Sequence, residues 1–261
     1  MDNTAMIGSA PNRVPNATAD FWMIKLMAVT VGETAADFLA VNLGLGLQLT
    51  SVLMTAVLVV AIAAQFMQKR YVPVYYWVAV VLVSVVGTLL TDNLVDNFGV
   101  PLLTTASVTA VLLALTFGLW YASERTLSIH SIVTTKREIF YWIAILLTFA
   151  LGTAVGDLVA EKMDVGYLMT ALLFAVVIGL IAVAYFVFKV NAILTFWLAY
   201  ILTRPLGASF GDLLSQPADY GGLGLGTVIT SGIFLAVIAA IVLYMSVTNR
   251  TGETVAVSGP A

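Results

Sequence analysis

The feature that most limits the fold of this chain is a three-residue signature that recurs four times. In each copy a Gly follows a Trp by ten residues, and an Asp follows that Gly by five. The four copies are Trp22, Gly32 and Asp37; Trp77, Gly87 and Asp92; Trp142, Gly152 and Asp157; and Trp197, Gly207 and Asp212. Repetition of this kind indicates one supersecondary unit built several times and stacked on its copies. We therefore predict four equivalent structural units.

The composition places these units in a lipid bilayer. Of 261 residues, 61% are hydrophobic and 10% are charged, whereas a soluble domain carries about 25% charged residues. Apolar runs of roughly the 20 residues that a helix needs to cross a bilayer fall at about 21–42, 47–67, 73–95, 100–121, 138–160, 165–187, 191–215 and 222–247. The predicted fold is an all-α integral membrane protein with eight transmembrane helices, arranged as four parallel tandem helical hairpins.

The basic residues predict how the hairpins are oriented. The hairpin repeats are expected at 21–68, 73–121, 138–187 and 191–247, with an N-terminal tail at 1–20, a loop at 122–137 and a C-terminal tail at 248–261. Most Lys and Arg residues fall in the tails or between repeats, and only Lys162 lies in a turn within a repeat. The positive-inside rule then places both termini in the cytoplasm. Because parallel repeats share an axis along the membrane normal, the four Asp residues are expected at one depth around it.

The Trp and Gly of each repeat have structural interpretations. Each Trp precedes its Asp by fifteen residues, about 22 Å of helix, so we interpret the four Trp residues as anchors at the cytoplasmic membrane interface. Each Gly is followed four residues later by a small residue: Ala36, Thr91, Gly156 and Gly211. Small residues at this spacing let helices in lipid approach closely.

The Asp is the candidate functional residue, because a carboxylate inside a membrane costs about 2.5–3.5 kcal/mol on insertion scales. The predicted cation- or proton-binding residues are Asp37, Asp92, Asp157, Asp212, Glu33 and Glu161. Like charges this close favour a bound cation or a shared proton. Arg204 is a possible charge partner, and Lys25 is expected to extend to the membrane interface. Capping of helix ends is the structural alternative for these acids.

Several classes of site are disfavoured by the residues that are missing. The chain has no Cys and only one His, His130, so thiolate and His-based metal centres are not expected, and no cofactor is predicted. Oxygen ligands alone suit hard cations, and Thr55, Thr109, Thr170 and Thr230 could add neutral oxygens. We expect no enzymatic activity. A retinal protein is rejected, because no Lys lies in the middle of the seventh span.

Three segments resemble a known family. They are Val31-Gly-Glu-Thr-Ala-Ala-Asp-Phe, Thr126-Leu-Ser-Ile-His-Ser-Ile and Thr203-Arg-Pro-Leu-Gly-Ala-Ser-Phe-Gly-Asp. Together with the four Trp residues, they are similar to a bacterial inner-membrane protein family of four tandem two-span repeats whose function is uncharacterised. The resemblance covers residues 20–247 and implies a bacterial inner (plasma) membrane location. It implies no activity.

The leading functional hypothesis is a transporter or permeation pathway for a small cation, either a divalent metal ion or one that is proton-coupled. The alternatives are a proton-coupled organic-solute transporter and a non-transporting membrane scaffold or sensor. The expected partners are the lipid bilayer and a small cation or proton, with no nucleic acid.

Overall fold

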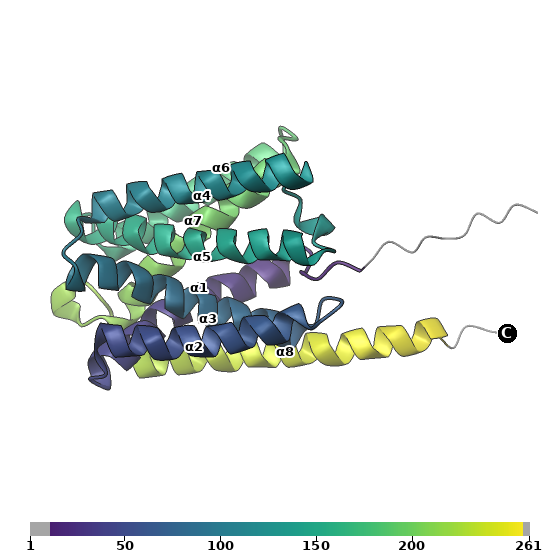
Figure 1. Ribbon diagram of the computed structural model, residues 1–261. Coiled ribbons are helices and arrows are strands. Elements are labelled where there is room, and N and C mark those ends of the chain that lie inside the picture. The colour runs from purple at the N-terminus through teal and green to yellow at the C-terminus, as the bar shows by residue number, and fades with distance from the viewer. Residues whose placement is uncertain (1–10, 258–261) are drawn as a thin grey trace, which may run out of the picture.

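The computed structural model describes residues 11–257, and within this range the chain is helical with no strand. Eight α-helices follow one another along the chain. They are α1 (Ala19–Asp37), α2 (Gly46–Phe66), α3 (Pro73–Asp92), α4 (Leu102–Glu124), α5 (Thr135–Asp157), α6 (Tyr167–Phe186), α7 (Ala192–Ser215) and α8 (Thr227–Val257). The helices lie side by side in one elongated bundle (Figure 1).

The odd-numbered helices form a closed inner ring. Helix α1 packs on α3, α3 on α5, α5 on α7, and α7 returns to α1. The even-numbered helices cover this ring, and each packs mainly on the inner helix of the next repeat: α2 on α3, α4 on α5, α6 on α7, and α8 on α1. The four repeats are therefore interlocked around one axis. The sequence predicts four tandem hairpins, and in the structure the main contacts of each outer helix are with the next repeat instead of with its own inner helix.

Seven of the described helical segments are long and apolar enough to cross a membrane. The eighth predicted crossing, α1, is not among them, because Lys25, Glu33 and Asp37 all fall within its apolar stretch. Two of these side chains do not face outward, however: Lys25 and Glu33 are buried in the bundle. The outer helices expose apolar side chains over most of their length.

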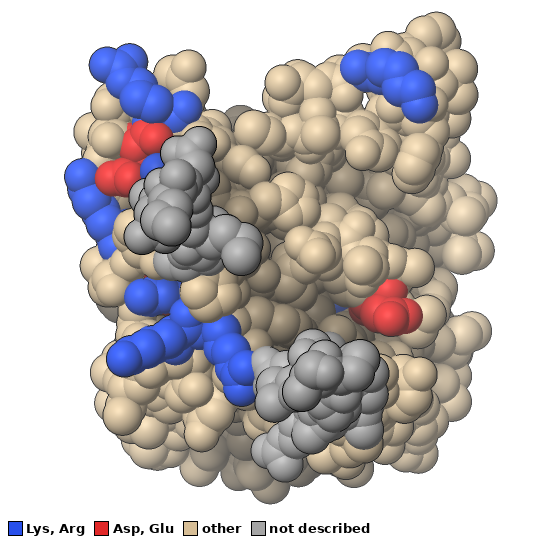
Figure 2. All heavy atoms as spheres, turned by 90° about the vertical axis from the view of Figure 1, so that its right-hand side faces the viewer, with Lys and Arg blue, Asp and Glu red and all other residues tan. Residues whose placement is uncertain are grey.

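The two ends of the bundle differ in charge. The described N-terminal segment, the loops between repeats and the C-terminal half of α8 lie at one end (Figure 1), which we call the basic end. On this face, which is largely uncharged, Lys and Arg side chains cover more of the surface than Asp and Glu do (Figure 2). Its basic residues are Arg13, Lys69, Arg70, Arg125, Lys136, Arg137 and Lys189. The opposite end, the acidic end, carries the turns within repeats, with Asp96, Glu161, Asp164 and Asp219 but only Lys162.

A ring of aromatic contacts closes the inner helices near the basic end. The residue before each signature Trp is aromatic, and its side chain contacts the Trp of the next repeat. The ring centroids are 5.6 Å apart for Phe21 and Trp77, 5.6 Å for Tyr76 and Trp142, 6.2 Å for Tyr141 and Trp197, and 5.6 Å for Phe196 and Trp22. Three of the four Trp residues are buried. Our interpretation of them as anchors facing lipid is therefore wrong, because the Trp side chains join neighbouring repeats.

The signature Gly residues do have the packing role that we predicted. A Cβ placed on Gly32, Gly87, Gly152 or Gly207 would collide with a side chain of the next inner helix, which is Ser84, Phe149, Arg204 or Val29 in turn. For Gly87 the nearest atom, Cβ of Phe149, would lie only 2.6 Å away. All four contacted residues occupy the same position of the repeat, seven after the Trp. The Gly therefore allows each inner helix to approach the next closely.

Candidate functional site

The four signature Asp residues, which we call the Asp quartet, lie where the inner helices approach the acidic end. Asp37, Asp92 and Asp157 are each the last residue of their α-helix, and a five-residue π-helix follows each one. The wider turns are closed by backbone bonds between residues five apart, such as Leu43 N to Phe38 O at 2.8 Å. Asp212 lies inside α7, which continues to Ser215 without a π-helix. Such π-helical turns often mark functional sites.

The quartet forms a closed ring in the order of the inner helices. Each Asp is close enough to the next one around the ring, from Asp37 through Asp92 and Asp157 to Asp212 and back, for their charges to interact. Glu33 interacts with all four. The prediction of one acidic site around a common axis therefore describes the arrangement of these residues.

A buried ion pair lies beside the quartet, toward the basic end. Glu33 Oε2 accepts a hydrogen bond from Arg204 Nη1 at 3.0 Å, and the Arg204 side chain is fully buried. Arg204 also donates to the hydroxyls of Thr88 and Thr153, and its Nη2–Oγ1 distance to Thr153 is 2.7 Å. One residue from each inner helix thus meets in this cluster. Glu33, Thr88 and Thr153 share one repeat position, eleven after the Trp, whereas Arg204 comes seven after its Trp. The ion pair therefore breaks the four-fold pattern at the axis.

The carboxylates of the quartet are poorly paired. Asp37 Oδ2 accepts a 3.4 Å hydrogen bond from Gln216 Nε2, whereas Asp92, Asp157 and Asp212 have no hydrogen-bond or ion-pair partner within the described chain. The Asp92 and Asp157 side chains are half-buried, and Asp212 is buried at 7% exposure. Helix capping, the structural alternative, is not seen at Asp37, Asp92 or Asp157, because none of their side chains bonds to the π-helix that follows. An accessible, unpaired carboxylate can take up a proton or a cation.

A compact metal centre is not formed by these side chains. Among residues 11–248, no three His, Asp or Glu side chains are grouped closely enough to hold one metal ion. Glu161, which we included in the predicted site, is exposed at the acidic end and accepts a hydrogen bond from the Tyr167 hydroxyl at 3.0 Å. It lies close enough to three members of the quartet for their charges to interact: Asp37, Asp157 and Asp212. Asp96 and Asp164 are exposed as well.

Lys25 was expected to reach the membrane interface, and this prediction is wrong. Its side chain is buried, with Nζ donating to the Tyr200 carbonyl at 2.7 Å and to the Thr203 hydroxyl. Nζ also lies 3.8 Å from the centroid of the Tyr200 ring. No carboxylate pairs with it among the described residues. Lys25 stays inside because α1 belongs to the inner ring and the Tyr200 carbonyl accepts its ammonium there.

Ionisable side chains continue from Lys25 to the basic end. The Tyr76 and Tyr141 hydroxyls are 2.5 Å apart, and Tyr141 is within electrostatic range of both Tyr200 and Glu138. Glu138 is fully buried, where it accepts hydrogen bonds from Arg13 at 2.8 Å and from Gln65 at 3.0 Å. Sequence reasoning missed these tyrosines and Glu138. The only signal was an aromatic residue before every signature Trp.

Of the four outer-helix Thr residues that we predicted, Thr170 and Thr230 are buried with a hydroxyl that lacks a partner in the described chain, and Thr55 and Thr109 are not. Thr55 is exposed, and Thr109 bonds to its own helix at the Thr105 carbonyl. The buried Thr hydroxyls that lack a partner at the starts of the outer helices are those of Thr50, Thr105, Thr170 and Thr230. The first three follow their signature Trp by 28 residues, a spacing that could have identified them.

Comparison with known proteins supports the repeat. The family described as "Repeat of Unknown Function (DUF347)" matches the chain four times, at residues 21–71, 75–126, 140–191 and 195–251. Each match contains one inner helix and the outer helix that follows it. No curated protein and no solved structure matches the chain.

Proposed function

The chain belongs to this family of repeats of unknown function, and from its geometry we propose that it is a membrane transporter that moves protons, alone or together with a small cation. The observation that carries the proposal is the closed ring of four carboxylates beside Glu33, three of which have no hydrogen-bond or ion-pair partner within the described chain. Intramembrane acids are costly and usually serve ion pathways or proton relays. Four equivalent ones are hard to explain by folding alone.

A proton or a partly hydrated cation suits the ring better than a dehydrated divalent metal ion. Mg²⁺ and Mn²⁺ need several oxygen ligands at short distance, and the described acids are not grouped closely enough to supply three. Carboxylates that repel one another across a ring can instead share protons. The quartet would exchange them with the medium at the acidic end.

The buried ionisable side chains supply the rest of the proposed path. From the quartet it runs through Glu33 and Arg204, past Lys25 and Tyr200, and on to Tyr141, Tyr76 and Glu138 near the basic end. The ion pair between Glu33 and Arg204 lies between the quartet and the rest of this column. We propose that protonation of Glu33 releases Arg204 and lets charge pass. The pair would act as the gate.

The orientation follows from charge. We propose that all eight helices cross a bacterial inner membrane, α1 included, because its buried charges face the bundle interior. The basic end would face the cytoplasm, in agreement with the positive-inside rule. The quartet would then open toward the outer side.

Purified protein in liposomes that contain a pH-sensitive dye tests the proposal. An imposed membrane potential should drive proton entry through the unmodified protein. If protons move alone, entry needs no other small cation in the buffer; if they are coupled to a cation, entry appears when that cation is added. Each of D37N, D92N, D157N and D212N should slow the flux at least about tenfold, a change of about 1.4 kcal/mol in the barrier. The exposed acid Asp164, whose charge does not act on the quartet, gives the matched control, D164N, which should transport normally. Equal flux through all four quartet variants and the control would overturn the proposal.

A further inference from the structure

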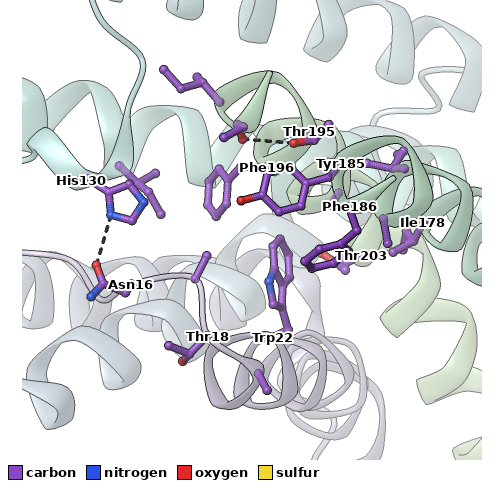
Figure 3. Close-up of a pocket in the computed structure, with 18 of the residues that line it drawn as sticks. Asn16, Thr18, Trp22, His130, Ile178, Tyr185, Phe186, Thr195, Phe196 and Thr203 are labelled. Carbon is purple, nitrogen blue, oxygen red and sulfur yellow. Dashed lines mark hydrogen bonds between the residues drawn. The ribbon is translucent and has the colours of Figure 1, made fainter. Parts of the chain in front are cut away.

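A cavity of about 710 Å³ lies near the basic end, outside the row of buried ionisable side chains that runs from the Asp quartet to Glu138. Helix α1 lines one side, α6 and α7 line the other, and the segment from Leu127 to His130 lies at its end. Figure 3 shows the Trp22, Phe196 and Phe186 rings around this space, with the hydrogen-bonded pair of His130 and Asn16 at one margin. Its volume is within the roughly 300–1,000 Å³ typical of sites for small organic ligands.

The internal repeat shows why the cavity occurs at this place in the bundle. With the Thr at the start of each outer helix as reference, Ala182 and Tyr185 of α6 correspond to Phe117 and Trp120 of α4. Trp120 is fully buried, and Phe117 packs at 4.8 Å from Trp197, so these two rings fill the equivalent space.

At these two positions the other outer helices, α2 and α8, carry residues larger than alanine, and those side chains pack into the core. They are Ile62 and Gln65 of α2 and Val242 and Met245 of α8. In α6 the residue at the Phe117 position is Ala182, whose side chain is only a methyl group, and the residue at the Trp120 position, Tyr185, is 40% exposed. One of four equivalent spaces is thus left open by the sequence itself.

The inner wall of the cavity adjoins a buried cation without a counter-ion. Thr203 and Leu26 line the cavity, and the Thr203 hydroxyl accepts a hydrogen bond from Lys25 Nζ. The positions equivalent to Lys25 in the other repeats are Val80, Ile145 and Tyr200. Among the four repeats, the lysine therefore occurs in the first alone, whose helix α1 lines one side of the open space. An isolated buried charge is unfavourable unless it is paired.

We propose that this cavity binds an anionic amphiphile, specifically a single-chain organic carboxylate, with its apolar chain between Trp22 and α6 and its carboxylate directed toward Thr203 and Lys25. The apolar walls would hold the chain, and the carboxylate would supply the missing counter-charge. This site is separate from the Asp quartet, and its existence does not depend on proton transport.

Quenching of tryptophan fluorescence by a brominated fatty acid tests the proposal, with the brominated alcohol of the same chain length as the uncharged comparison. The protein in lipid nanodiscs should show saturable quenching by the acid, and W22F should lose that component. The alcohol should bind at least about tenfold more weakly than the acid, a difference of about 1.4 kcal/mol.

Two variants locate the ligand. A182F copies the side chain of the filled interface in α4, so it should fold normally and lose saturable quenching. K25M should weaken acid binding at least about tenfold and leave alcohol binding unchanged. The proposal is overturned if the acid and the alcohol bind alike to the unmodified protein, or if A182F binds the acid as well as the unmodified protein does. These two results can be read even if K25M does not fold.

Discussion

Removing one member of the ion pair between Glu33 and Arg204 should destabilise the bundle strongly and asymmetrically. Breaking a buried ion pair costs about 3–5 kcal/mol, because the remaining charge is left buried without a partner. In R204M the remaining charge is Glu33, which interacts with all four carboxylates of the quartet. We therefore expect a loss of about 5 kcal/mol in the free energy of unfolding, the upper end of that range.

The reverse variant should cost less. E33Q keeps the shape of the side chain, and an amide oxygen can still accept from Arg204 and Thr88, whose bonds to Glu33 Oε2 are 3.0 and 3.3 Å long. It also removes one negative charge beside the quartet. We expect a loss of about 3 kcal/mol. The double variant should lose less than the sum of the two, by about 1–3 kcal/mol, because the two residues are in contact.

Unfolding in detergent micelles, titrated with a denaturing detergent and followed by tryptophan fluorescence, measures these differences. D164N is the control, because it alters an exposed acid at the acidic end whose charge does not act on the quartet, and it should stay within about 0.5 kcal/mol of the unmodified protein. An R204M variant as stable as D164N, or effects of R204M and E33Q that add without coupling, would show that the ion pair does not stabilise the bundle.

Two further predictions concern packing and hydrogen bonding. G87A should lower the free energy of unfolding by about 1–3 kcal/mol, because its Cβ would overlap with Phe149 and overpacking is destabilising. The control G179A, whose Cβ would meet no atom within 4 Å, should be neutral or stabilising by up to about 1 kcal/mol. The same detergent titration compares the two variants. Y76F should lower the free energy of unfolding by about 1–3 kcal/mol, because the Tyr141 hydroxyl loses its 2.5 Å partner. The double variant Y76F/Y141F leaves no unpaired hydroxyl and should be more stable than Y76F in a melting experiment. Equal instability of the two variants would show that the unpaired hydroxyl is not the cause.

The sequence predicted the repeated elements well, because their signals are local. The spacing of Trp, Gly and Asp predicted four equivalent units, and the small residues predicted close helix contacts, which Gly87 and Phe149 make. The ring of Asp residues followed from parallel repeats around one axis. In each case the repeat alone carries the information.

The partners across the bundle could not be predicted in the same way. A short turn joins the two helices of a repeat and suggests that they pack together, yet α2 packs on α3 and α8 closes on α1. Lys25 and the Trp residues were misjudged for this reason. A charged or amphipathic side chain near a helix end reaches the membrane interface only if its helix faces lipid, and α1 faces the interior instead. The partner of Arg204 could not be identified for the same reason: Glu33 lies 171 residues away in the sequence, and only the order of the inner helices brings the two together.

Charge is proposed to enter the bundle through the Asp quartet, and electrical current measured on a solid-supported membrane reports that entry. Proteoliposomes with the unmodified protein should give a transient current when the pH or the concentration of a coupled small cation is stepped. The variant in which Asp37, Asp92, Asp157 and Asp212 are all replaced by Asn should give none, while D164N, at an exposed acid outside the quartet, keeps the full current. A quadruple variant that folds and carries the same current as D164N would show that charge does not enter through the quartet.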